Sequence, residues 1–549
     1  MTIWSDLTKF EVSKSLSEII GHWGRIHILV VVDSIVSFGS GHDPRNLRED
    51  FFGMGHLISV LNQVATLTKA HRTNDPLTEP EVISNFRFDE HNLNNYHQIW
   101  LLGYASGMLP EPERAALADF MNKGGGVFAT GDHADLGSAL ARGLPRVGSM
   151  RHWQSPPPSS GPNRIDTTRP DINNVVVFEN QSDDIPQVLR LKQYQWSQHK
   201  WYREVYPHPL LCSPSGSITE FPDHMHEGEV VVPTNLDDEM KIGDKIFDEY
   251  PKDRNGNRVS PEVVAWGWTT GRADPEVMHD IHTGDPGAST PRWTGTIGVY
   301  DGHQANVGRV VVHSTWHHFF DINLIGDNAA NLPGFSDPRA ALWRKGFTAS
   351  PNGLRILSQI DQYYKNIVHW LSPGVGRLLL FNGLIAQLAM SHHIREVIEF
   401  NHASELQVGA YAWEYALRYY PPCLLIELTF IPIEVIPVPW GPWGGPDPGP
   451  DPGPDDAPMP HWPIPPKQLA QAALGGALLG FTQIESIEEI RHESGVERVR
   501  IGALEGVMAI LKTEHRQAKD GMRQFESILN QLEENSRRIN DNNKTTTQV

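Results

Sequence analysis

Short runs of consecutive apolar residues, separated by helical patterns, constrain the fold of this chain more than any other feature. Three runs have the β-branched character of strands that are buried on both faces, namely residues 26–33, 98–104 and 127–130. Residues 51–61 and 110–123 instead place apolar side chains at helical spacing, and residues 65–70 can form a further strand. The resulting β-α-β-β-α-β-α order over residues 25–140 predicts an α/β fold, with a mostly parallel, doubly wound sheet covered by helices on both faces.

The segment at residues 124–137 (GGGVFATGDHADLG) predicts a strand, a sharp turn and the start of a helix near Leu136. The turn carries Asp132, His133 and Asp135 at the carboxyl edge of the predicted sheet, where α/β proteins place their chemistry. A purely structural alternative is that Asp132 and Asp135 cap the following helix and interact with its dipole.

Two further segments are dense in histidine and carboxylate. The side chains that they offer are Asp223, His224, His226, Glu227 and Glu229 in a predicted loop, and His317, His318 and Asp321 just beyond a predicted strand at residues 308–315. A solvated loop with chance histidines remains the alternative for the first segment. In the second segment, we expect one histidine of the pair to pack in the core and the other to face the site.

The first and third of these segments can converge in one crevice, because both follow strands at the carboxyl edge. Imidazole and carboxylate from separate loops suit either a zinc ion with an open position or a proton-transfer pair. The candidate metal ligands are His133, His224, His226, Glu227 and His317. The candidate catalytic residues are Asp132, His133, Asp135, His317 and His318, and the candidate pocket residues are Asp33, Ser34, Tyr104, Asp223 and Asp321.

Composition excludes several classes of function. The formal net charge of −20 argues against nucleic acid as a partner, because phosphate binding requires clustered Lys and Arg. Cys212 and Cys423 could pair, but two cysteines cannot build a disulfide framework or a Cys-based zinc ribbon. We find neither a secretory signal nor an apolar run that is long enough to span a bilayer, so we expect a soluble cytoplasmic protein with no membrane partner.

The pattern divides the chain into six parts. They are a lead-in (1–24), the α/β domain (25–372, with an insertion at about 181–287), an appended α+β segment (373–432), a Pro/Gly/Asp-rich linker (433–466), a helical module or coiled-coil arm (467–534) and a disordered tail (535–549). Within the appended segment we predict helices at 378–400 and 404–419 and a short apolar strand at 424–430.

The order of these pieces resembles the class I glutamine amidotransferase-like superfamily, especially its trehalose-utilisation-protein-like branch. The matching segments are residues 26–33, 98–103, 124–131 and 308–318, and the resemblance covers residues 25–372. It implies a flavodoxin-like fold, an oxyanion-hole loop around residues 103–104 and a catalytic histidine near His317 or His318. The family's Gly-x-Cys-x-Gly elbow aligns with residues 131–135, where His133 replaces the cysteine. A covalent thioester mechanism is therefore excluded.

Our leading hypothesis is a hydrolase of a small-molecule substrate, acting by acid–base chemistry or through a divalent metal, zinc first, and without a nucleotide cofactor. The alternative is a non-catalytic amidotransferase-like binding or scaffold protein. In that case the arm at residues 467–534 would bind a protein partner or a second copy of the chain.

Overall fold

The structure is a computed structural model. It describes residues 26–39, 52–74, 81–132, 135–152, 187–199, 202–222, 229–269, 292–326, 346–401, 403–430, 464–484, 489 and 493–546. The chain forms two compact units. The α/β unit comprises Ser17–Leu384 and Leu417–His461, and the helical unit comprises Met1–Leu16, Ile385–Ala416 and Trp462–Val549.

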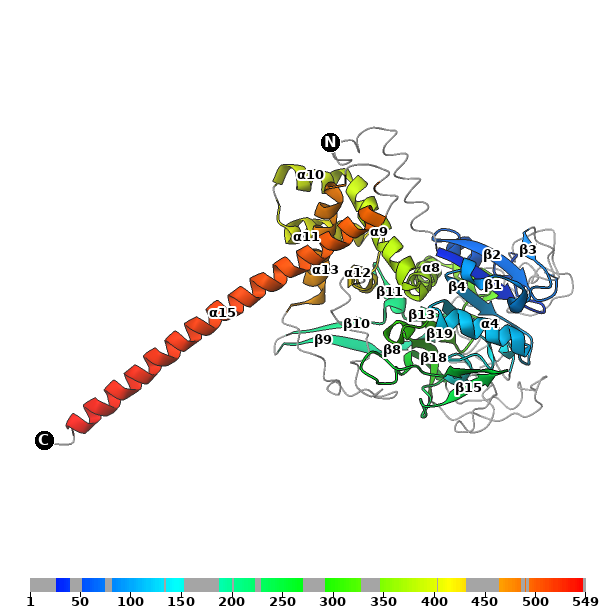
Figure 1. Ribbon diagram of the computed structural model, residues 1–549, viewed down its shortest axis with the longest axis horizontal. Coiled ribbons are helices and arrows are strands. Elements are labelled where there is room, and N and C mark those ends of the chain that lie inside the picture. Colours follow the sequence, from blue (N-terminus) through cyan, green and yellow to red (C-terminus); the bar gives the residue numbers. More distant parts are fainter. Residues whose placement is uncertain are drawn as a thin grey trace. The chain divides into compact units, whose positions relative to one another are not determined.

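A nine-stranded sheet forms the centre of the α/β unit (Figure 1). Its strands, in spatial order, are β3 (Val82–Ile83), β2 (Ala65–His71), β1 (Ile26–Val32), β4 (Gln98–Leu102), β5 (Gly126–Thr130), β19 (Val310–His313), β18 (Arg292–Tyr300), β17 (Glu262–Thr269) and β8 (Arg190–Leu191). Neighbours from β3 to β19 pair parallel, and β19, β18, β17 and β8 pair antiparallel. The predicted α/β fold with a mostly parallel sheet is confirmed.

Strands from the predicted insertion extend this sheet, since β17 and β8 lie within residues 181–287. The remaining strands form two-stranded antiparallel pairs: β9 (Gln193–His199) with β10 (Tyr202–Pro207), β11 (Cys212–Ser213) with β12 (Gly216–Ser217), β13 (Glu220–Phe221) with β7 (Gln187–Val188), β14 (Glu229–Val230) with β6 (Arg151–His152), and β15 (Glu239–Ile242) with β16 (Lys245–Asp248). Short 3₁₀ turns occur at Phe88–Glu90, Leu93–Asn95, Gly148–Met150, Pro209–Leu211, Gly302–Ala305 and Gly346–Ala349.

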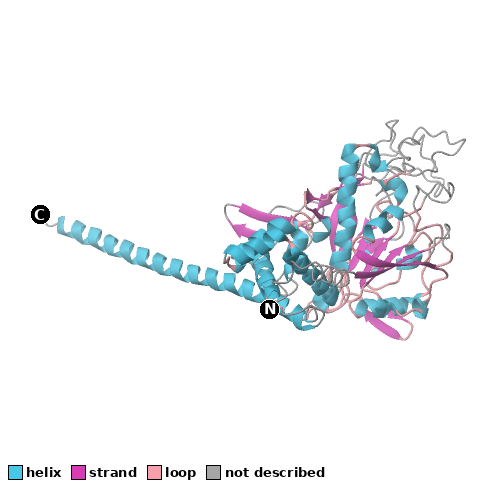
Figure 2. Ribbon diagram, turned by 90° about the horizontal axis from the view of Figure 1, so that it is seen from above, coloured by secondary structure: helices cyan, strands magenta, loops and turns pink. Residues whose placement is uncertain are grey.

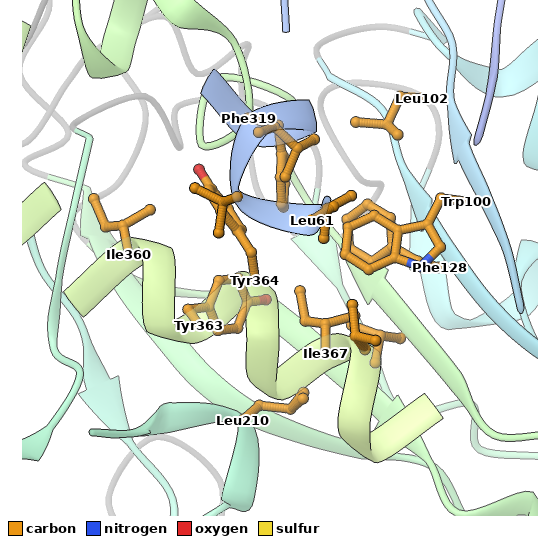
Figure 3. Packing of buried hydrophobic residues seen from close by; sticks show 14 of the residues in the cluster. Leu61, Trp100, Leu102, Phe128, Leu210, Phe319, Ile360, Tyr363, Tyr364 and Ile367 are labelled. Carbon is orange, nitrogen blue, oxygen red and sulfur yellow. The ribbon is translucent and has the colours of Figure 1, made fainter. Parts of the chain in front are cut away.

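Helices cover both faces of the sheet, because successive residues of a buried strand point to opposite sides. Ile28 and Val30 of β1 belong to one core cluster, with helices α3 (Gly55–Leu61) and α8 (Pro351–Leu371). Leu29 and Val31 belong to the other cluster, with α4 (Glu111–Asn122) and α5 (Ser138–Ala141). Figure 2 shows strands, in magenta, beside helices, in cyan. Figure 3 shows part of the first core, where Ile360, Tyr363, Tyr364 and Ile367 of α8 belong to one cluster with Trp100 and Phe128 of the sheet.

The strand that we predicted at residues 424–430 is wrong, because this segment forms helix α12 (Pro422–Phe430). Every residue from Cys423 to Phe430 is buried, including the polar Glu427 and Thr429, and periodicity cannot distinguish a buried helix from a buried strand. Cys423 at its start forms a disulfide with Cys212 of β11, which settles the pairing that the sequence left open.

Close contacts between helices organise the helical unit. Its elements are α10 (His392–Asn401), α11 (Glu405–Ala416), α13 (Pro466–Thr482), α15 (Glu493–Thr546) and the end of α9 (Gly374–Met390). Ser391 separates α9 from α10, so the single helix predicted at 378–400 is two helices. A Cβ atom on Gly475 would lie 1.7 Å from the Glu405 carbonyl oxygen, and one on Gly476 would lie 2.1 Å from that of Gly502. Glycine therefore lets α13 approach both α11 and α15.

The long helix α15 continues to Thr546, although the sequence indicated a disordered tail from residue 535. Among the described residues, no helix combines the length and the apolar character that crossing a bilayer requires.

Candidate functional site

The candidate site lies where the neighbouring parallel strands β5 and β19 end. Their register pairs Thr130 with His313, so the residues that follow the two strands leave the sheet side by side. The Thr130 hydroxyl donates to the Thr315 carbonyl oxygen at 2.7 Å, which joins the two strand ends. The sheet therefore holds Asp132 close to the segment at residues 314–317.

The turn after β5 has a shape that glycine makes possible. The backbone N–H of Asp132 donates to the Leu136 carbonyl oxygen at 3.0 Å, which closes the turn. Gly137 has a φ of +82°, and a Cβ atom there would lie 2.8 Å from both the Gly103 carbonyl oxygen and Gly131 Cα. A larger residue at position 137 would be strained, and the turn would move Asp132.

Asp132 and His317 form the central contact of the site. Oδ2 of Asp132 lies 3.0 Å from Nε2 of His317, and both side chains are buried. The other ring nitrogen of His317, Nδ1, lies 3.1 Å from Oδ1 of Asn323 on helix α6 (Asp321–Leu324). The backbone N–H of His317 donates to the Thr315 hydroxyl at 3.1 Å, which fixes the backbone beneath the ring.

These contacts identify the ring nitrogen of His317 that donates a hydrogen bond to Asp132. An ionised carboxylate only accepts hydrogen bonds, so Nε2 of His317 donates to Asp132. Nδ1 then either donates to the amide oxygen of Asn323, as part of an imidazolium, or accepts from its amide nitrogen, as part of a neutral ring. In the neutral form, Asp132 holds the ring in the tautomer whose basic atom is Nδ1.

The buried guanidinium of Arg151 is hydrogen-bonded to the segments that follow both strands. It donates to the carbonyl oxygens of Asp132 at 2.8 Å and of Ser314 at 2.7 Å. Burial lowers the pKa of Arg151 to about 10, and the nearby Asp132 charge opposes this change. Arg151 therefore remains a cation at neutral pH and favours the ionised form of Asp132.

His318 points away from Asp132. Its Nε2 lies 2.9 Å from the Pro222 carbonyl oxygen, and its ring stacks on Phe221 with a centroid distance of 5.0 Å. Burial lowers the pKa of His318 to about 3, so the ring is neutral and packs in the core. The two adjacent histidines thus face different surroundings.

Asp33, at the end of β1, accepts hydrogen bonds from the backbone N–H groups of Tyr104 at 2.6 Å and Ala105 at 2.9 Å. Burial raises the pKa of Asp33, although these hydrogen bonds act in the opposite direction. The resemblance to amidotransferases implied an oxyanion-hole loop at residues 103–104. In the structure, an internal carboxylate already occupies the amides of this loop.

The remaining described candidates are Asp135, Tyr104, Asp321 and Ser34. Asp135 accepts from the Ser106 hydroxyl at 2.7 Å, and the Tyr104 ring stacks on Trp316 with a centroid distance of 5.1 Å. Asp321 is buried, and its Oδ1 accepts from the backbone N–H of His56 at 2.9 Å. Ser34 is exposed and has a left-handed backbone with a φ of 55°.

In the part of the chain that the structure describes, two side chains that could bind a metal ion come together. Asp132 and His317 meet, but these described residues contain no group of three histidine, cysteine or carboxylate side chains that could hold an ion. A catalytic zinc site uses three protein ligands. The other candidates, His133, Asp223, His224, His226 and Glu227, lie outside the described residues.

Two residues of the site, Asn323 and Arg151, were not predicted from the sequence. Asn323 follows His317 by six positions, and only the short helix α6 brings its amide back to the ring. Arg151 begins a stretch rich in Pro and Ser, where no pattern marks it as buried. A polar residue shortly after a strand-end histidine is a signal that could have identified Asn323, but we find no comparable signal for Arg151.

Comparison of the chain with protein-family models, with curated proteins and with solved structures gave no match.

Proposed function

We propose that the chain is a hydrolase in which His317 acts as a general base and Asp132 orients it. The observation that carries this proposal is the 3.0 Å contact between Asp132 Oδ2 and His317 Nε2 at the ends of adjacent strands. A carboxylate that fixes the imidazole tautomer and stabilises the imidazolium is the arrangement by which histidine accepts a proton from an attacking hydroxyl or water. In this proposal, the reacting group displaces the Asn323 amide, which lies 3.1 Å from Nδ1 of His317, and Nδ1 then accepts that proton.

The strand order is compatible with the flavodoxin-like fold that the resemblance to amidotransferases implies. Renumbered along the chain, the six parallel strands β3, β2, β1, β4, β5 and β19 follow the order 3-2-1-4-5-6 of Rossmann sheets, and without the two-residue strand β3 the other five follow the order 2-1-3-4-5 of flavodoxin-like sheets. Both cysteines are joined in the disulfide, which supports a mechanism without a thiolate nucleophile. A small-molecule substrate is part of the proposal, and zinc remains a candidate that Asp132 and His317 would help to bind.

Hydrolysis of a panel of chromogenic esters, anilides, phosphates and glycosides by the purified chain tests this proposal. We expect Asp132→Asn and His317→Gln each to lower kcat/KM by about 10²- to 10⁴-fold on any substrate that is turned over. His392→Gln is the matched control, because His392 is exposed and its nearest partner is Glu396 on the same helix. Equal activity in all four proteins would exclude the Asp132–His317 pair as the catalytic base. Metal analysis of the wild type and of His133→Ala tests zinc separately.

A non-catalytic ligand-binding or scaffold protein is the second candidate. It is supported by Asp33, whose carboxylate takes the Tyr104 and Ala105 amides that would otherwise be available to an oxyanion. If the wild-type chain turns over none of the panel, this second candidate gains support over the hydrolase.

A further inference from the structure

The second half of α15 presents an apolar stripe to solvent. Every residue from 515 to 534 is exposed. Five large apolar side chains on this segment are between 42% and 67% exposed, namely Met522, Phe525, Ile528, Leu529 and Leu532. An isolated helix is marginally stable in water, and exposed apolar residues at regular spacing normally face another helix.

The spacing of the stripe is that of a two-stranded coiled coil. Alternating steps of three and four residues place Ile501, Met508, His515, Met522 and Leu529 at the first core position of each heptad, and Leu504, Leu511, Ala518, Phe525 and Leu532 at the second. This face differs from the one that packs inside the helical unit, where Val499, Ala503 and Val507 are buried.

We propose that residues 511–533 of α15 bind the same segment of a second copy of the chain as an antiparallel coiled coil. In the register that places Met522 against Phe525 of the second copy, Ala518 faces Leu529 and His515 faces Leu532. A two-fold axis generates each of these contacts twice.

Charge complementarity selects this arrangement. The flanking positions on one side of the seam carry Lys512, Lys519, Glu526 and Glu533. In the antiparallel register, Lys519 lies opposite Glu526 of the second copy, and Lys512 lies opposite Glu533. Moving the register by one heptad would bring like charges together at the centre.

A parallel pair fits less well. It would give a single type of opposite-charge contact, between Glu514 and Lys519, and it would place two His515 rings against each other in the core. The area of the antiparallel seam lies near the lower end for specific interfaces. At roughly 200 Å² per large side chain, the exposed fractions of Met522, Phe525, Leu529 and Leu532 amount to about 900 Å² for two copies, before Ile528 and the charged flanking residues are counted, and specific interfaces bury about 1,200 Å² or more.

Sedimentation velocity of the full chain at a series of concentrations tests the proposal. We expect a species of twice 61.5 kDa for the wild type and of 61.5 kDa for Leu529→Asp, with unchanged helix content by circular dichroism. Glu526→Lys should weaken the dimer at least tenfold, and the swapped double variant Lys519→Glu/Glu526→Lys should restore it. Asp520→Lys is the matched control, because it makes the same charge change on the outer face of the helix and should leave the mass unchanged.

A monomeric wild type at all concentrations would overturn the proposal, as would a dimer that survives Leu529→Asp. A dimer that Glu526→Lys weakens but the double variant does not restore would overturn the antiparallel register. These results are independent of the hydrolase assay, because none of the substituted residues lies in the α/β unit.

Discussion

Replacing Glu427 with glutamine should strongly destabilise the α/β unit. Glu427 lies on helix α12 and is buried, and its Oε1 is 2.7 Å from a guanidinium nitrogen of Arg309 and 3.1 Å from one of Arg377. Arg309 also lies 2.6 Å from Asp301, so two carboxylates balance the buried Arg309 and the partly buried Arg377. Glutamine preserves the shape of Glu427 but leaves this network with one uncompensated positive charge.

The size of the effect follows from burial. Removing one partner of a buried ion pair costs about 3–5 kcal/mol, because the remaining charge stays desolvated. Asp301 still compensates Arg309, and Arg377 is partly exposed, so we expect a loss near the lower limit, about 3 kcal/mol. For a unit of roughly 400 residues, the corresponding decrease in Tm is about 3–4 °C. The disulfide between Cys212 and Cys423 still anchors α12, so the variant should fold.

Urea unfolding of the wild type, of Glu427→Gln and of the double variant Glu427→Gln/Arg377→Gln measures this effect. The double variant removes the uncompensated charge and should recover at least 1 kcal/mol, about the coupling expected between residues in one network. Asp119→Asn is the control, because it breaks an exposed ion pair with Lys245 and should cost at most about 1 kcal/mol. A loss below about 1 kcal/mol in Glu427→Gln would refute the reasoning.

Two further predictions concern the helical unit and the pH dependence. Gly476→Ala should destabilise the helical unit by roughly 1–3 kcal/mol in denaturant unfolding followed by circular dichroism, because the added Cβ meets the Gly502 carbonyl oxygen at 2.1 Å. Gly521→Ala, with nothing within 4 Å, should instead gain about 1 kcal/mol. Burial lowers the pKa of His56, but its 2.6 Å hydrogen bond to Asp361 and the nearby carboxylate charges outweigh this, so the pKa is raised. The stability that this shift contributes is fully present below the unfolded pKa of about 6.5 and is lost as the pH rises through the folded pKa. His56→Gln should therefore lower the free energy of unfolding more at about pH 5.5 than at about pH 9. Equal decreases at the two pH values would contradict this assignment.

The central parallel strands could be predicted from the sequence because they are mostly apolar. Residues 26–32 are apolar except for His27, and five of these seven residues are β-branched, which favours a strand over a helix. Helix α12 could not be predicted in the same way, because residues 422–430 are also mostly apolar, and their contacts with Cys212 and Arg309 involve residues more than a hundred positions earlier.

In the candidate site, too, the local sequence pattern predicted some features, and contacts between distant residues determined others. The sequence placed Asp132 and His317 at strand ends on one edge of the sheet, and the parallel pairing of β5 with β19 brings them to 3.0 Å. The choice between His317 and His318 depended on which ring turns toward Asp132, and that is decided by packing of His318 on Phe221. Arg151 enters the site through contacts with residues 19 and 163 positions away, which no local pattern encodes, whereas Asn323 lies only six residues after His317.

Asp33 and Asp132 lie after different strands and affect the two candidate functions differently. Parallel strands reverse their order between β1 and β4, and that switch point is where open α/β sheets usually bind ligands. There, Asp33 already satisfies the two amides that an anionic ligand would use. Asp132, by contrast, lies beyond β5 and is bonded to an imidazole that can carry a proton. An oxyanion hole or an anion site built from these amides would have to displace Asp33, whereas the proton transfer that we propose for His317 can proceed with Asp33 in place.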